Sequence, residues 1–183
     1  AYVPGDVELF PNLTGNQVLD TLAKLRPTGD NKKKRAEYIE RFKLDPTKKI
    51  RTYSKGNRQK VMLIAAFAAN VDILVLDEPT SGLDPALDRQ IMTTLRRLAD
   101  SGVGVVLISH NLTDVFEVAD RIHIHRLGRR LTVIDPKEYS MSDAVALMTG
   151  AMRPKAMPAM MMPGVAMGRA ARRKAVRTSP DRK

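Results

Sequence analysis

Two short apolar runs that each end abruptly in polar residues constrain the fold more than any other feature of this sequence. Val71–Leu76 ends in Asp77 and Glu78, and Val103–Ser109 ends in His110. Apolar runs of this length, rich in branched side chains, are typical of buried strands in a parallel sheet. Because open α/β sheets bind ligands at the carboxyl ends of their strands, these polar residues are candidates for a single site.

Helix-start signals precede the segments around the two runs. A serine, threonine or aspartate before an amphipathic stretch accepts hydrogen bonds from first-turn N–H groups. Such signals predict helices after Thr14 (with Gln17 completing a capping box), after Ser54 over about 57–69, after Asp84 and after Ser142, besides a further helix over about 31–44. Alternating strands and helices predict an α/β fold with a parallel sheet.

Composition narrows the classes of protein that fit. Hydrophobic residues make up 43% of the 183 residues, enough for a buried core. The absence of cysteine excludes disulfide scaffolds, cysteine-ligated metal centres and a thiol nucleophile. The longest apolar run, Val61–Ala69, is much shorter than the roughly 20 residues that cross a bilayer. The predicted class is therefore an intracellular, soluble protein.

Positive charge is concentrated at the C-terminal end. Residues 151–183 carry +8 of the formal net charge of +11, together with six of the ten methionines. No apolar periodicity runs through them, so we predict a domain over 1–150 and a disordered basic tail over 151–183. A solvated terminus is favoured over a nucleic-acid arm, because no aromatic side chain is available for stacking on bases. No specific nucleic-acid partner is expected.

The acidic pair at the end of the first run lies within a longer motif. Adjacent carboxylates in an apolar setting are costly unless a cation or a proton offsets them. The pair has the Walker B arrangement of ATPases, in which Asp77 is predicted to hold Mg²⁺ and Glu78 to polarise the attacking water. DEPTSGLD at Asp77–Asp84, YSKGNRQK at Tyr53–Lys60 and the later His110 together resemble the ATP-binding cassette (ABC) family of transport ATPases.

This resemblance covers about residues 1–150 and implies a fold. It predicts a P-loop NTPase-like, three-layer α/β domain, with a helical signature subdomain over about 10–60 and a catalytic core over about 61–135. No G-x-x-x-x-G-K-[ST] P-loop occurs in the sequence. The domain is therefore expected to be incomplete at its N-terminus, and the chain to be the C-terminal part of a longer subunit that is inactive by itself.

The resemblance also implies roles for individual residues. Glu78 and His110 are the implied catalytic residues, His110 as the switch histidine that senses the γ-phosphate, and Asp77 is the implied metal ligand. A signature motif at a helix start contacts ATP held by a second subunit, where free N–H groups and a glycine suit an anion. The implied ATP-binding residues are Ser54, Lys55, Gly56, Asn57 and Gln59 of the signature, and Ser81, Gly82 and Asp84 of the D-loop at the dimer interface.

Several of these residues have an ordinary structural interpretation as well. Ser54 and Asp84 are helix N-caps whether or not they meet a nucleotide, and a histidine at a strand end is more often structural. His123 and His125 alternate along a predicted strand, and we interpret them as one face of a hairpin instead of metal ligands.

Three positions depart from the family pattern. Lys55 stands where the signature has glycine, Asn57 where it has glutamine, and Gly5 where the Q-loop has glutamine. A lysine adds positive charge beside phosphate, so the first change is compatible with ATP contact. The signature region is similar to drug or polyketide exporters, whereas residues from about 115 to 150 are similar to sugar importers.

The sequence thus predicts an ATP-binding and ATP-hydrolysing subunit of an ABC transporter, with ATP and Mg²⁺ as cofactors. Its expected partners are a second ABC ATPase subunit in a head-to-tail dimer and transmembrane permease subunits, which place it on the inner face of the cell membrane. The alternatives are a non-catalytic fragment and a non-transport ABC protein.

Overall fold

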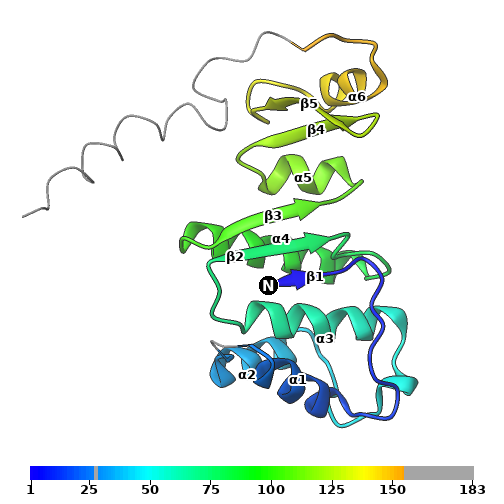
Figure 1. Cartoon of the computed structure of the whole chain (residues 1–183), viewed down its shortest axis with the longest axis vertical. Helices are drawn as coiled ribbons and strands as arrows, with labels where there is room; N and C mark the ends of the chain where they lie inside the picture. Colours follow the sequence, from blue (N-terminus) through cyan, green and yellow to red (C-terminus); the bar gives the residue numbers. More distant parts are fainter. Residues whose placement is uncertain (27–28, 155–183) are drawn as a thin grey trace, which may run out of the picture. The chain divides into compact units, whose positions relative to one another are not determined.

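The computed structural model describes residues 1–26 and 29–154, and the chain divides into two compact units, 1–118 and 119–183. The first unit holds a parallel sheet with helices, and the second holds a β-hairpin and one helix (Figure 1). In those two described stretches, no helix combines the length and the apolar character needed to cross a bilayer. From residue 155 on, the predicted tail lies outside the described residues; the domain boundary near residue 150 stays a prediction.

The sheet of the first unit has the spatial order β1 (Tyr2–Val3), β2 (Ile73–Asp77), β3 (Gly104–Ile108), with all strands parallel. The two apolar runs therefore form neighbouring strands, as predicted. The register pairs Asp77 with Ile108, so both strands end at the same edge. The strand β1 was not predicted, because a segment of two residues carries no periodicity.

One face of this sheet is buried and the other is exposed in the described residues. Val3, Leu74 and Leu76 are at most 1% exposed, whereas Ile73 and Val106 are 58% and 50% exposed. Successive side chains of a strand point to opposite faces, which explains the alternation. Full burial, predicted from the unbroken apolar runs, is therefore found for one face only.

Helices α3 and α4 pack against the sheet, and α1 and α2 form a further layer on α3 (Figure 1). Helix α3 contacts β1, helix α4 contacts β3, and helices α1 and α2 pack against α3. Rings of Tyr38, Phe42 and Phe67 meet where α2 packs on α3, with centroids 5.5–6.2 Å apart. The helical elements of this unit are α1 (Gly15–Lys24), α2 (Lys32–Arg41), the 3-10 turn η1 (Ile50–Thr52), α3 (Lys55–Phe67), α4 (Pro85–Asp100) and α5 (Leu112–Val118).

The helix starts follow the predicted caps. The Thr14 hydroxyl accepts from the Gln17 N–H at 3.3 Å, and the Gln17 side chain accepts from the Thr14 N–H at 2.8 Å, which confirms the capping box. The carboxylate of Asp84 caps α4. Helix α3 begins directly after its cap Ser54, two residues earlier than predicted, because the Ser54 hydroxyl accepts from the Asn57 N–H and so closes the first turn at residues 55–57.

The second unit confirms the hairpin and corrects one cap. Strands β4 (Ile122–Arg126) and β5 (Arg129–Ile134) are antiparallel, and His123 and His125 lie on the exposed face of β4. Helix α6 (Met141–Thr149) is capped by Ser140, whose hydroxyl accepts from the Asp143 N–H at 3.1 Å. The prediction of Ser142 as the cap was wrong, because the Asp143 side chain completes a capping box with Ser140.

Candidate functional site

Asp77, Glu78 and His110, the predicted metal ligand and catalytic residues, lie where β2 and β3 end; we call them the strand-end cluster. The Glu78 carboxylate accepts a hydrogen bond from the His110 backbone N–H at 2.9 Å and lies 2.7 Å from its ring Nδ1. Both carboxylate oxygens are therefore held by one residue. With Glu78 ionised, this pairing places a proton on Nδ1 and leaves Nε2 for another partner. The His110 side chain is 83% exposed, so its ring is accessible.

The backbone at Glu78 turns sharply as the chain leaves β2. Its φ is +44°, an uncommon conformation for a residue other than glycine that costs on the order of 1 kcal/mol. The Glu78 N–H donates to the Ile108 carbonyl at 2.9 Å, and its own carbonyl accepts from the Ser81 N–H at 3.1 Å. These two bonds fix the turn beside the end of β3, within reach of His110.

The N-terminal segment lies against this cluster. A methyl group built on Gly5 would lie 3.3 Å from the Asp77 carbonyl oxygen and 3.4 Å from Glu78 Cβ. A larger residue here therefore requires its neighbours to shift by a few tenths of an ångström. Gly5, which stands where the Q-loop has glutamine, thus lies beside Asp77 and Glu78. Glycine suits this position because it has no side chain to hinder the close approach of the two backbone segments.

Gln59, predicted to bind ATP, lies inside the protein. Its side chain is 1% exposed, and its amide nitrogen donates to the Pro4 carbonyl at 3.5 Å. This contact ties α3 to the N-terminal segment that passes the strand-end cluster. In this structure the partner of the Gln59 side chain is the Pro4 carbonyl. Contact of Gln59 with a nucleotide stays a prediction.

The signature loop, Ser54–Asn57, forms the start of α3. The Ser54 hydroxyl accepts from the Asn57 N–H at 3.2 Å, so its own proton remains available to an acceptor. The side chains of Ser54 and Lys55 are exposed. First-turn N–H groups of a helix have no acceptor within the helix, so an anion at this end would find free donors.

The D-loop, Ser81–Asp84, follows the Glu78 turn and leads into α4. Gly82 has φ +76°, which glycine adopts without strain. The Asp84 carboxylate accepts from the Leu87 and Ala86 N–H groups, and these bonds, with the charge of Lys60, lower its pKa. Its role as an N-cap is therefore confirmed, while its part in ATP binding stays a prediction.

Sequence reasoning missed an acidic contact between α4 and α5. Burial, followed by the charge of Asp114, raises the pKa of Asp88, which also has a hydrogen bond with the Thr80 side chain. Asp114 in turn accepts from the Asn111 amide at 2.6 Å. No motif marked these residues, because only the packing of two helices brings them together.

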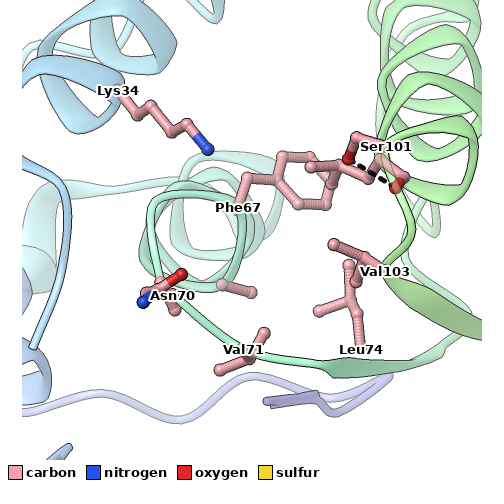
Figure 2. Close-up of a pocket in the computed structure, with 10 residues that line it drawn as sticks. Lys34, Phe67, Asn70, Val71, Leu74, Ser101 and Val103 are labelled. Carbon is pink, nitrogen blue, oxygen red and sulfur yellow. Dashed lines mark hydrogen bonds between the residues drawn. The ribbon is translucent and has the colours of Figure 1, made fainter. Parts of the chain in front are cut away.

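A shallow pocket lies at the opposite ends of the same strands. It is bordered by Phe67, Leu74 and Val103, and Figure 2 shows Lys34 reaching toward it from α2. The Ser101 hydroxyl at its rim donates to the Leu98 carbonyl at 2.8 Å. Since ligands of α/β sheets bind at the carboxyl ends of strands, this pocket is not the candidate site.

Comparisons with known proteins identify a family and relatives that this chain resembles. A family model described as ABC transporter matches residues 1–81. The fructose import ATP-binding protein of Rhizobium meliloti is 51% identical over 105 residues, 57% of this chain and 40% of that protein. The ATP-binding/permease protein of Mycobacterium tuberculosis is 37% identical over 73% of this chain and 16% of its own length. The chain thus spans less than half of these relatives.

Solved structures share the fold. An ATP-binding subunit of an ABC transporter superposes with a TM-score of 0.73 at 23% identity, covering 81% of this chain and 68% of that chain. A dimeric ATP-binding cassette bound to ADP and phosphate gives a TM-score of 0.63 at 26% identity, covering 74% and 62%. Residues 1–81 of this chain are therefore similar to the ABC transporter family, and the chain shares the fold of solved ATP-binding cassettes.

Proposed function

We propose that this chain is part of an ATP-binding and ATP-hydrolysing subunit of an ABC transporter, which drives solute transport through separate membrane subunits. One observation carries the proposal: both oxygens of the Glu78 carboxylate are held by His110 where two parallel strands end. The signature loop lies in the same compact unit. The match of residues 1–81 to the ABC transporter family supports the assignment.

Glu78 serves as the general base in this proposal. Each carboxylate oxygen has two lone pairs, so Glu78 accepts the bonds from His110 and still accepts the proton of an attacking water. The bonds from His110 hold the carboxylate in one orientation. The accessible Nε2 of His110 is then available to a phosphate oxygen, so the same ring positions the base and senses the phosphate.

The residues present fit Mg²⁺ bound together with ATP. Mg²⁺ keeps several waters and is usually held by one or two carboxylates plus substrate phosphates. Within the described stretches, no group of three or more histidine, aspartate or glutamate residues is arranged to hold a metal ion by itself. Asp77 would hold Mg²⁺, with phosphate and water as its other ligands. The ion would offset the phosphate charge.

The site residues fall into two groups that would serve different ATP molecules, and this division implies a partner subunit. Asp77, Glu78 and His110 would serve an ATP of the same subunit, whereas the signature loop and the D-loop, with Ser81, Gly82 and Asp84, would meet an ATP held by a second ABC ATPase subunit. The dimeric state of solved cassettes supports such a head-to-tail dimer. Permease subunits would hold the dimer at the cytoplasmic face of the membrane.

A non-catalytic role of this chain is the second candidate. The sequence contains no G-x-x-x-x-G-K-[ST] motif, whose backbone and lysine cradle the β- and γ-phosphates. We therefore expect the chain alone to bind MgATP weakly and to show no turnover. Calorimetry on the purified chain measures this directly, and tight MgATP binding would contradict the expectation.

A mixing experiment tests the proposed half-site. The chain is mixed with a complete ABC ATPase subunit whose own signature serine has been replaced by a bulky residue. The ATP bound by the partner can then contact an intact signature motif only on this chain. The rate of ATP hydrolysis is therefore expected to rise above that of the altered partner alone. Ser54→Arg should abolish the gain, because its long side chain fills the place of the phosphate.

Ser142→Arg is the matched control, since Ser142 is also exposed near a helix start but lies in the second unit. It should leave the gain intact. A gain that survives Ser54→Arg would contradict the signature assignment, and the absence of a gain in a confirmed heterodimer would contradict the half-site itself.

A further inference from the structure

We infer that the tip of the β4–β5 hairpin docks on an anionic lipid surface, with Leu127 entering the headgroup region and Arg129 and Arg130 contacting lipid phosphates. This contact would attach the chain to a membrane directly, besides any contact with permease subunits. It rests on the geometry and charge of the second unit and does not depend on the proposed ATPase role.

The tip of this hairpin carries an exposed leucine. Strand β4 ends at Arg126, β5 begins at Arg129, and these two residues are paired across the strands (Figure 1). Leu127 and Gly128 therefore form a two-residue loop. The Leu127 side chain is 90% exposed, so it makes little contact within the protein.

The turn itself does not call for leucine. Leu127 has φ +50° and Gly128 has φ +73°, as in the tight hairpin turns where asparagine followed by glycine is preferred. A leucine at positive φ is uncommon, because its Cβ crowds the following carbonyl oxygen. Asparagine would suit this turn better and would expose less apolar surface. The leucine is therefore better explained by a contact outside the chain.

Arginines surround the leucine and lack counter-charges. Arg126 and Arg129 flank the loop, and Arg130 lies opposite His125 on the neighbouring strand. Residues 121–134 include no aspartate or glutamate. Among residues 1–26 and 29–154, these arginines form no ion pair. The hairpin thus places like charges side by side, which destabilises a sheet unless an anion offsets them.

The titration of His123 is consistent with this positive potential. Burial lowers its pKa most, and the charges of Arg121 and Arg130 lower it further. A surface potential of one sign that is not balanced nearby attracts partners of the opposite sign. The hairpin is therefore suited to an anionic partner.

A contact with α6 brings more basic residues to the same place. A methyl group built on Gly150, the C-cap of α6, would collide with the Arg126 guanidinium. A cation at this end of a helix also complements its last carbonyl groups. The chain therefore leaves α6 beside the hairpin tip, and residues 151–183, with a formal charge of +8, are attached there.

An apolar tip within a basic surround favours a lipid surface over other polyanions. Segments that lie in a membrane interface combine inserted apolar side chains with basic residues that attract anionic lipids. Nucleic acid is less favoured, because residues 122–134 include no aromatic side chain for stacking on bases. A leucine would also gain nothing from contact with a phosphate backbone.

Vesicle sedimentation of the whole chain tests the role of the leucine. We expect binding to phosphatidylcholine vesicles only when they also contain phosphatidylglycerol. Leu127→Asn should lower this affinity by about threefold to tenfold, because apolar insertion is lost. Its melting temperature should not fall, since asparagine suits the turn. Leu25→Asn, the same change at a leucine that is 74% exposed in the first unit, is the matched control and should bind normally.

Two arginine variants test the charge of the hairpin. Arg129→Gln and Arg130→Gln should each lower the affinity about fivefold, the effect of one basic residue near an anionic surface. Arg89→Gln removes the same charge from an exposed position of α4 and should have little effect. Equal losses in all three variants would show attraction by net charge alone and would overturn the inference. Unchanged affinity of the hairpin variants would assign binding to another segment, with the same consequence.

A fluorescent label tests insertion itself. The chain contains no cysteine, so Leu127→Cys offers a single site for an environment-sensitive dye. Its emission should shift to the blue on addition of vesicles that contain phosphatidylglycerol. Glu138→Cys, at an exposed position of the same unit, should show no shift. If the labelled chain sediments with vesicles but the dye at position 127 does not shift, the leucine is not inserted and the inference is wrong.

Duplex DNA distinguishes the competing partner. If Arg129→Gln weakens DNA binding while Leu127→Asn changes the affinity for neither DNA nor vesicles, the hairpin is a nucleic-acid surface and the inference is overturned. None of these measurements involves ATP hydrolysis. Failure of the lipid contact therefore leaves the proposed ATPase role standing, and loss of that role leaves the lipid contact standing.

Discussion

The strand-end cluster and the signature loop are built by different means. Glu78 and His110 are joined through a side chain, across 32 positions of sequence, and a strained backbone turn holds the carboxylate in place. The signature loop is made of backbone N–H groups, glycine and a local cap between Ser54 and Asn57. The strand-end cluster therefore depends on the chemistry of its side chains. The signature loop depends on the space that glycine leaves by having no side chain.

This difference predicts different responses to substitution. Removing a side-chain function at the strand ends should abolish chemistry and leave the fold largely intact. At the signature loop, adding atoms should do more harm than removing them. The predictions below test this contrast, beginning with the largest expected effect.

The largest effect is expected from Glu78→Gln in a complete subunit. Glutamine keeps the shape of the side chain but does not accept a proton, so ATP should still bind while kcat falls by about 10²–10⁴-fold. Single-turnover hydrolysis and ATP binding measured on the same preparation separate the two effects. Glu40→Gln, at an exposed position of α2, is the control; unchanged turnover of Glu78→Gln would move the base elsewhere.

His110→Ala should have a smaller effect on the same reaction. The backbone N–H of residue 110 still donates to the Glu78 carboxylate, so one of its two contacts with residue 110 survives. We expect kcat to fall by up to about 10²-fold, with ATP binding less affected. If His110→Ala costs as much as Glu78→Gln, then the ring takes part in the chemistry itself and does more than orient the base.

Ser54→Ala is expected to act on stability. It removes the side-chain acceptor of the Asn57 N–H, and loss of such a cap costs about 1 kcal/mol of the free energy of unfolding. Urea unfolding of the chain measures the change. Ser142→Ala, within the first turn of α6, removes no cap and should be nearly neutral; an equal loss in both variants would contradict the role of Ser54 as a cap.

The smallest effect concerns Asp88 on α4, which interacts with Thr80 and Asp114. Burial and Asp114 raise its pKa above the ordinary 3.8, so the folded state holds its proton to a higher pH than the unfolded state does. The associated stability is present below the ordinary value and is lost as pH rises through the raised one. Asp88→Asn should therefore stabilise the chain at neutral pH, by less than about 0.5 kcal/mol because water screens the charge of this partly exposed carboxylate.

The gain from Asp88→Asn should disappear at a pH below the ordinary carboxyl value, where Asp88 is protonated in both states. Thermal unfolding at neutral and acidic pH measures this difference. Asp72→Asn, at an exposed aspartate, serves as the control. A gain that is equal at both pH values would show that the charge of Asp88 is not its cause.

Local patterns predicted most of the elements. A capping box, an N-cap followed by proline and two apolar runs each depend on residues within a few positions of one another, so the sequence contains the whole signal. The cap of α6 was misplaced by two residues because Ser140 and Ser142 are both plausible caps, and only the contact of Asp143 with Ser140 distinguishes them. The short strand β1 lacked any local signal.

By itself, the sequence indicated which residues are candidates for chemical function and where most of the helices and strands lie, because short-range hydrogen bonds and apolar periodicity leave local patterns for both. Only the tertiary structure decided which of these residues meet. It placed His110 on the Glu78 carboxylate, buried Gln59 against Pro4, and seated Gly56 on the D-loop. Such contacts join positions far apart in the chain, and they follow from the pairing of strands and the packing of α3, which no local pattern specifies.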